Sequence, residues 1–179
     1  MLFMTQPRDP LSTNMPESQN SSRKRLAFDS PEQEAYLNLW RTYDRLRVIE
    51  DKLFGENDLT AQQYNALRLL AVRSTEGMPT LEVARRLVSR APDITRLINP
   101  LVEKGWVTRT RPEGNRRMVR LAITASGLEL LRQLDGPVKE CGALQLGHLG
   151  RDDLQELCRL LRLARTPHEE ISSIWAPEA

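Results

Sequence analysis

Cysteine and histidine are scarce in this chain of 179 residues, which has two of each. The two cysteines, Cys141 and Cys158, exclude a disulfide framework and a four-thiolate zinc site. Aromatic residues make up 5% of the chain, and there is no run of about 18 apolar residues that would span a membrane. The apolar run at the start is too short for a signal peptide, so we expect a cytoplasmic protein. We also expect no cofactor and no metal.

The common enzyme signatures are also lacking, namely the phosphate-binding GxxxxGK[ST] loop, the GxSxG elbow and the HExxH zinc motif. We therefore do not expect an enzyme. What the sequence does have is an uneven distribution of charge. The whole chain carries a net charge of +2, whereas residues 89–120 hold eight basic and three acidic residues, a net charge of +5. Such a basic field suits a polyanion, although charge alone fits a solvated surface equally well.

Apolar periodicity predicts six helices and one β-hairpin, a mainly α fold with a small β-hairpin. Residues 1–29 are rich in Ser, Asn, Gln and Pro, and we expect a disordered tail there. Helices are expected over 31–54, 61–74, 81–88, 89–104, from 125 onward and over 151–165. The two strands are expected at 106–111 and 118–123, and a break at 76–79. Gly136 and Pro137 should kink the fifth helix, and residues 166–179 should form a second tail.

The first expected helix carries an aromatic stripe that includes Trp40 and Tyr43. The helical spacing favours packing in a core or against another subunit. The third helix, capped by Thr80, should turn Leu81, Ala84 and Leu87 inward. Because only a short turn separates it from the fourth helix, and Ala84 is small enough for a close crossing, the pair predicts a helix-turn-helix.

On a helical wheel, Ile94, Leu97, Ile98 and Leu101 share one face of the fourth helix. The opposite and flanking residues are the candidates for DNA contact: Ser89, Arg90, Pro92, Thr95, Arg96 and Asn99. Arginine can bind a guanine edge and asparagine an adenine edge in the major groove. The hairpin, or wing, adds candidates for a minor-groove contact: Arg111, Asn115, Arg116 and Arg117. The alternative is an ordinary amphipathic helix beside a basic turn.

Residues 93–109, DITRLINPLVEKGWVTR, resemble the recognition helix and its exit in the MarR family of winged helix-turn-helix transcription regulators. The segment Asn115–Arg117, followed by residues 121–124 and Gly127, resembles the wing motif Asp-x-Arg with its trailing Leu-Thr-x-x-Gly. The likeness covers about 31–165. Two residues depart from the family pattern: Asn115 stands where the family has Asp, and Pro100 stands in the recognition helix where the family has a basic residue.

The resemblance implies a homodimer that binds double-stranded DNA as a transcription regulator. Residues 31–57 and 125–165 would form a helical dimerisation region, and residues 58–124 a winged helix-turn-helix lobe. We expect a repressor that reads a pseudo-palindromic operator and is released by a small effector, often aromatic in this family. As the alternative to packing in a core or against another subunit, Trp40 and Tyr43 would line the cleft that holds this effector. Two alternatives stay open: a winged-helix module that binds proteins without DNA, and a redox-sensing regulator that uses Cys141 or Cys158.

Overall fold

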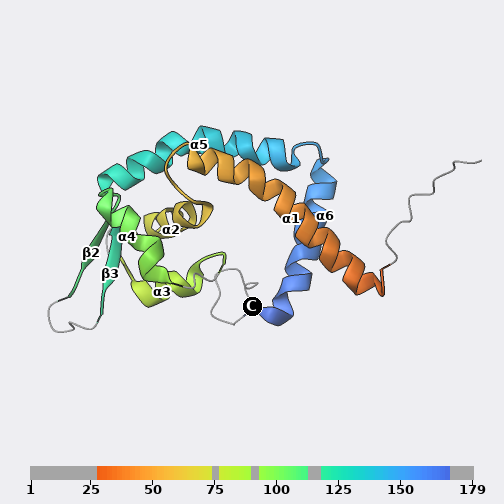
Figure 1. Ribbon diagram of the computed structural model, residues 1–179, viewed down its shortest axis with the longest axis horizontal. Helices are drawn as coiled ribbons and strands as arrows, with labels where there is room; N and C mark the ends of the chain where they lie inside the picture. The colour runs from red at the N-terminus through yellow and green to blue at the C-terminus, as the bar shows by residue number, and fades with distance from the viewer. Residues whose placement is uncertain (1–27, 74–76, 90–92, 113–117, 170–179) are drawn as a thin grey trace, which may run out of the picture. The chain divides into compact units, whose positions relative to one another are not determined.

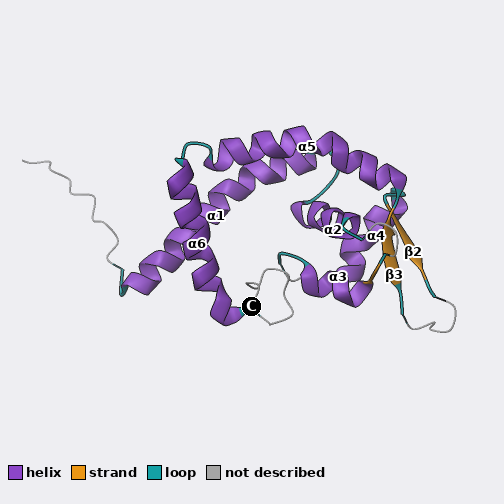
Figure 2. Cartoon of the chain, turned by 180° about the vertical axis from the view of Figure 1, so that it is seen from behind, coloured by secondary structure: helices purple, strands orange, loops and turns teal. Residues whose placement is uncertain are grey.

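The computed structural model describes residues 28–73, 77–89, 93–112 and 118–169. It is mainly helical with one small antiparallel sheet, so the predicted fold class is confirmed (Figures 1 and 2). The helices are α1 (Pro31–Gly55), α2 (Ala61–Ala71), α3 (Thr80–Arg86), α4 (Ile94–Glu103), α5 (Ala125–Leu146), α6 (Arg151–Arg165) and the 3-10 turn η1 (Thr166–His168). The strands are β1 (Met78–Pro79), β2 (Val107–Thr110) and β3 (Arg120–Ile123).

The chain forms two compact units, residues 1–38 and residues 39–179, and the features below belong to the second. Its core is built by α2, α3, α4 and the sheet, with Phe54 from the end of α1 and Leu131 and Leu134 from α5. The largest side chains there are almost fully buried: Phe54, Leu67, Leu70, Met78, Ile98, Leu101 and Leu121. The Phe54 and Tyr64 rings stack with their centroids 4.7 Å apart, which joins the end of α1 to α2. None of the helices in the described ranges is long and apolar enough to cross a membrane.

The sheet has a third strand that periodicity did not predict, because β1 lies in the segment 76–79 that was expected to be a break. The strand order is β1-β3-β2, and all pairs are antiparallel. Met78 and Arg109 lie on opposite sides of Leu121 in the central strand. Two residues are too few to show a period of two, so β1 forms through its pairing with β3 and not through its own pattern.

The start and the rotation of α3 also differ from the prediction. Thr80 was expected to cap this helix, but its backbone N–H and its Oγ1 both donate to the carbonyl of Val119, at 3.0 and 3.1 Å. Leu81, predicted to face inward, is 64% exposed, and Val83 is buried in its place. Because the contact with Val119 fixes the first turn of α3, the sheet sets which face of the helix meets the core.

Helix α4 is shorter than the predicted 89–104 and begins at Ile94. Asp93 is its N-cap, and the Asp93 carboxylate accepts the backbone N–H groups of Thr95 and Arg96 at 2.9 and 3.1 Å. Ser89 therefore lies in the segment between α3 and α4, where its Oγ accepts a hydrogen bond from Gln62 of α2 at 2.9 Å. The helix runs through Pro100, whose carbonyl accepts the N–H of the next turn.

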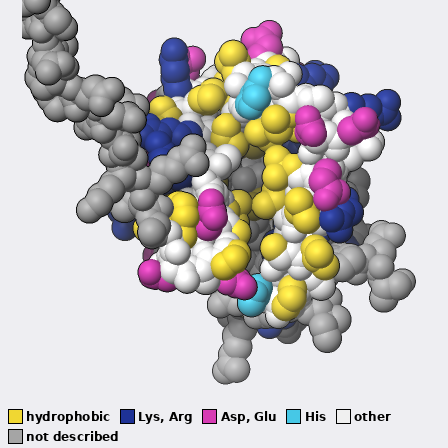
Figure 3. Space-filling model, turned by 90° about the vertical axis from the view of Figure 1, so that its right-hand side faces the viewer, with side chains coloured by type: hydrophobic (Ala, Val, Ile, Leu, Met, Phe, Trp, Pro, Cys, Tyr) yellow, Lys and Arg dark blue, Asp and Glu magenta, His cyan; other side chains and the backbone are white. Residues whose placement is uncertain are grey.

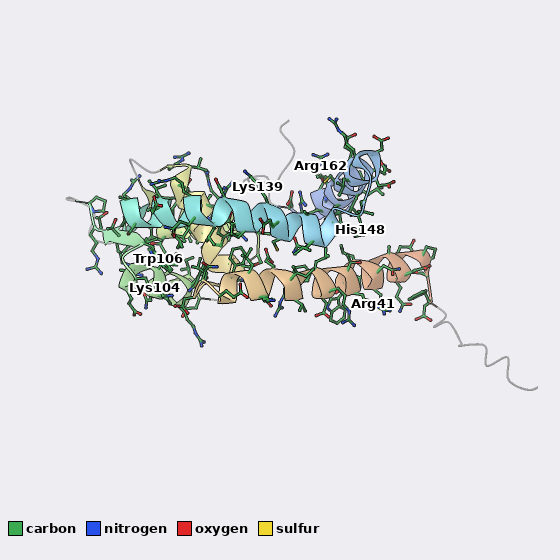
Figure 4. The ribbon with its side chains drawn as sticks, turned by 90° about the horizontal axis from the view of Figure 1, so that it is seen from above. Arg41, Lys104, Trp106, Lys139, His148 and Arg162 are labelled. Atoms are coloured by element: carbon green, nitrogen blue, oxygen red, sulfur yellow. The ribbon has the colours of Figure 1, made fainter. Side chains whose placement is uncertain are left out.

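Helix α5 continues as one helix past Gly136 and Pro137, where a kink was expected. The part of α1 from Leu39 runs beside α5, and Gln145 donates to the carbonyl of Leu46 at 3.0 Å (Figures 1 and 4). At its other end α5 meets the root of the hairpin. A Cβ on Gly127 would collide with the carbonyl oxygen of Trp106, so glycine allows this close approach.

Candidate nucleic-acid interface

The predicted division of α4 into a buried and an exposed face is confirmed. Leu97, Ile98 and Leu101 are buried, whereas the residues of the opposite face, Thr95, Arg96 and Asn99, are exposed. The apolar face anchors α4 against α2 and β2, because those are the elements that it contacts most. The helix thus presents a hydroxyl, a guanidinium and an amide to solvent from a rigidly held backbone.

Asp93 is a residue of this surface that the sequence reasoning did not assign. Its carboxylate occupies the N–H groups at the start of α4, where a helix would otherwise favour a phosphate. A phosphate is therefore not expected at these N–H groups, so a bound nucleic acid would be contacted by the side chains beyond them. The sequence signal was available, since an Asp directly before the first apolar position is a usual N-cap.

Arg109 is a second residue that was missed. It lies exposed on β2, and its Nη2 donates to Oδ1 of Asn99 at 2.9 Å. Arg111 is also exposed, two residues further along the chain. Both arginines line a cavity of about 720 Å³ between α3, α4 and the sheet, together with apolar side chains that include Leu81 and Val119. The charge of the basic segment is thus brought next to the exposed face of α4.

The base of the hairpin is tied to the loop before α2. Lys104, at the C-terminal end of α4, places its Nζ 4.8 Å from the centroid of the Trp106 ring (Figure 4). The same Nζ donates to the carbonyl of Asp58 at 2.7 Å. Lys104, one of the basic residues of the segment 89–120, therefore has a structural role at this point.

Five of the predicted DNA contacts lie outside the described residues: Arg90, Pro92, Asn115, Arg116 and Arg117. Of the remaining predicted residues, the structure brings Thr95, Arg96 and Asn99 together on α4. Ser89 and Arg111 are exposed on the segments that precede α4 and follow β2. Their assignment as DNA contacts stays a prediction.

A second cavity, of about 560 Å³, lies between α2, α3 and α5. Its apolar lining includes Tyr64, Leu87 and Val138, and its cationic side chains include Arg68 and Lys139. Burial raises the pKa of the Tyr64 hydroxyl, so this group stays a neutral donor. Trp40 and Tyr43, the residues predicted for a ligand cleft, line neither of these two cavities and are 60% and 58% exposed.

The two cysteines lie in different surroundings. Cys141 on α5 is buried, and burial, together with the nearby Glu50 carboxyl, raises the pKa of its thiol. Cys158 on α6 is exposed. Among the residues that the structure describes, no group of three or more His, Cys, Asp or Glu side chains is placed to hold a metal ion.

Comparison with known proteins finds one matching family and several proteins of similar sequence or structure. The sequence model of the MarR family matches residues 59–119. The crystal structure of a MarR transcription factor from Planctomyces limnophilus is 55% identical to this chain, and the match covers 76% of this chain and 99% of the other, with a TM-score of 0.62. The chain spans between 55% and 65% of the length of curated bacterial relatives that it matches.

Two more distant structures share the fold. A mutant of MarR from Escherichia coli, solved in complex with operator DNA, is 20% identical, and the match covers 73% of this chain and 93% of the other, with a TM-score of 0.66. BpsR from Bordetella bronchiseptica, whose DNA binding is described as regulated by 6-hydroxynicotinic acid, is 21% identical. That match covers 77% of this chain and 96% of the other, with a TM-score of 0.65.

Proposed function

The chain belongs to the MarR family of DNA-binding transcription regulators, and we propose that it represses transcription as a homodimer on a pseudo-palindromic operator from which a small aromatic effector releases it. Two copies of α4 would enter successive major grooves, and the two wings would contact the flanking minor grooves. Residues 58–124 would form the DNA-binding lobe, and residues 31–57 with 125–165 the dimerisation region.

The observation that carries this proposal is the polar exposed face of α4 beside the basic strand β2. Arg96 and Thr95 are exposed on a helix whose opposite face is buried, which suits base contacts in a groove about 12 Å wide. The proposed contacts are Ser89, Arg90, Pro92, Thr95, Arg96 and Asn99 from the recognition segment, and Arg111, Asn115, Arg116 and Arg117 from the wing. A surface for a protein partner would be more apolar at its centre, so this face favours DNA over the interaction module.

Dimerisation is supported by large apolar side chains that the single chain leaves exposed. On α5 and α6, Leu144, Leu160 and Leu163 are 72%, 47% and 63% exposed, and α6 has no buried residue. Figure 3 shows hydrophobic side chains gathered on the face that includes α6. Trp40 and Tyr43 on α1 are exposed as well. Apolar stripes of this extent are usual where another subunit covers them.

The cavity between α2, α3 and α5 is the site that we propose for the effector. Its apolar lining fits an aromatic ring, and Lys139 supplies positive charge for a carboxylate, whereas Arg68 is paired with the Asp135 carboxylate at 3.9 Å. The neutral Tyr64 hydroxyl adds a donor. Because the cavity is lined by both α2 of the DNA-binding lobe and α5 of the dimerisation region, a ligand there would bias how the two regions pack. The structure gives less support to redox sensing through Cys141, since a raised pKa lowers the thiolate fraction.

Selection of bound duplexes from a random DNA library, combined with light scattering that measures the mass of the free protein, tests the proposal. We expect a dimer and an enriched inverted repeat whose half-sites are about one helical turn apart, roughly 10 base pairs. Benzoate as a probe effector should weaken binding, and Lys139→Ala should reduce that response. A monomer, or a library without an enriched sequence, would contradict the proposal.

A further inference from the structure

The contact between Arg109 and Asn99 joins two elements that both face the proposed DNA. Asn99 lies on the exposed face of α4 and Arg109 on β2, and the bond from Nη2 to Oδ1 measures 2.9 Å. Both side chains are exposed, so neither is held there by burial. The bond therefore reflects how the helix and the strand place the two residues relative to each other.

The backbone on each side of this contact is well anchored. Asn99 follows Ile98, which is completely buried, and Arg109 pairs across the sheet with the equally buried Leu121. The tight turn between α4 and β2 is closed by the N–H of Trp106, which donates to the carbonyl of Leu101 at 2.9 Å. Gly105 takes a φ of 72° in this turn, a conformation that suits glycine. Helix and strand thus hold the backbones of the two residues at a fixed separation.

The direction of the bond determines what Asn99 has left to offer. A guanidinium has only donors, so the amide must turn Oδ1 toward Arg109 and Nδ2 away from it. Two-bond recognition of adenine needs both ends of the amide, since Nδ2 donates to N7 while Oδ1 accepts from N6. Oδ1 keeps a second lone pair, so the bond does not fill it, but the bond turns Nδ2 away from Arg109 and fixes which end of the amide faces a base.

We propose that Arg109 is a positioning residue that fixes the orientation of the Asn99 amide and so sets the base preference at the position that Asn99 contacts. The inference rests on the proposed function, because it requires α4 to lie in the major groove. Entry into the groove removes water from the pair, and a charge-assisted bond gains strength when water is excluded. Breaking the bond in that setting would leave the Arg109 guanidinium and Asn99 Oδ1 unsatisfied until each formed a new hydrogen bond.

A double-mutant cycle on the full-length protein tests this assignment. Wild type, Asn99→Ala, Arg109→Ala and the double variant are titrated against the selected operator and its single-base variants. We expect Asn99→Ala to flatten the preference at one position in each half-site. Arg109→Ala should reduce the preference at that same position by about 5- to 100-fold, the range of one good base contact. The double variant should match Asn99→Ala there.

Arg111→Ala is the matched control, because it removes the same charge two residues further along and lines the same cavity. It should weaken all operator variants equally without a change of base preference. Arg109→Lys should retain part of the wild-type preference, since lysine also donates but without the fixed fork. Thermal unfolding checks that each variant is folded.

Two results would overturn the inference. If Arg109→Ala weakened binding to every operator variant equally, and the losses were additive in the double variant, Arg109 would be identified as a phosphate contact. A shift of preference at a position that Asn99→Ala leaves unchanged would identify it as an independent base contact. Failure of the proposed function is distinguishable from both, because wild type itself would then show no preferred sequence.

Discussion

At the scale of single residues, the arginines of the basic segment have different expected tasks. Arg96→Ala should cost about 1–3 kcal/mol per half-site on the best operator and relax the preference at one base, because Arg96 lies on the exposed face of α4. Arg117→Ala should weaken binding to many sequences alike and reduce the salt dependence, as expected for a wing arginine. Titration of both variants against single-base operator mutants at two salt concentrations separates these effects. If Arg117→Ala changed the preference at a central base and Arg96→Ala did not, the two assignments would be reversed.

A second prediction at this scale concerns two glycines of α5. Gly127→Ala should lower the free energy of unfolding by about 1–3 kcal/mol, because the added methyl would collide with the Trp106 carbonyl oxygen. Gly136→Ala has nothing within 4 Å of the new methyl, so it should raise the helix propensity and stabilise by about 0.5–1 kcal/mol. Denaturant unfolding measures both. Equal stability changes in the two variants would show that the close approach at Gly127 is absent.

At the scale of helices and strands, the success of sequence reasoning depends on length and on local signals. Helix α6 was predicted over 151–165 and has those bounds, because its apolar stripe is regular over all 15 residues. The two-residue β1 could not be predicted, since it depends on pairing with β3, which is distant in sequence. The early start predicted for α4 ignored the Asp93 cap, a signal that the sequence did contain. The link between Arg109 and Asn99 follows from the tertiary placement of β2 beside α4, and no spacing rule along the chain indicates it.

The cap of α4 gives a prediction of its own. Asp93→Ala removes the acceptor for the N–H groups of Thr95 and Arg96, so it should destabilise the protein by about 0.5–2 kcal/mol. Asp93→Asn keeps an acceptor oxygen and should cost much less. Because both changes remove a negative charge beside the proposed DNA surface, both should strengthen non-specific DNA binding at low salt. Urea unfolding measures the change in stability, and titration with random-sequence duplex measures the effect of the lost charge on DNA binding. A loss of stability in Asp93→Asn as large as that in Asp93→Ala would argue against capping.

At the scale of the whole molecule, the exposed apolar side chains of α6 should decide the oligomeric state. Leu163→Glu should shift the dimer toward monomer at micromolar concentration, because a carboxylate would be buried without a partner in the proposed interface. Val72→Glu is the matched control, since Val72 is 82% exposed at the end of α2, outside the proposed dimerisation region, and the dimer should persist. Analytical ultracentrifugation reports both. A wild-type monomer would contradict the proposed dimer, and a Leu163→Glu dimer of undiminished stability would place the interface elsewhere.

The short strand β1 has a consequence for aggregation. A sheet of three strands has two edges, and an open edge is a template on which another chain can add a strand. At the β1 edge, Pro79 has no N–H to donate to a newcomer. At the other edge, β2 is four residues long and carries the exposed cation of Arg109. Each edge thus has a feature that disfavours sheet extension, so the proposed association through apolar helices would have little competition from pairing between sheets.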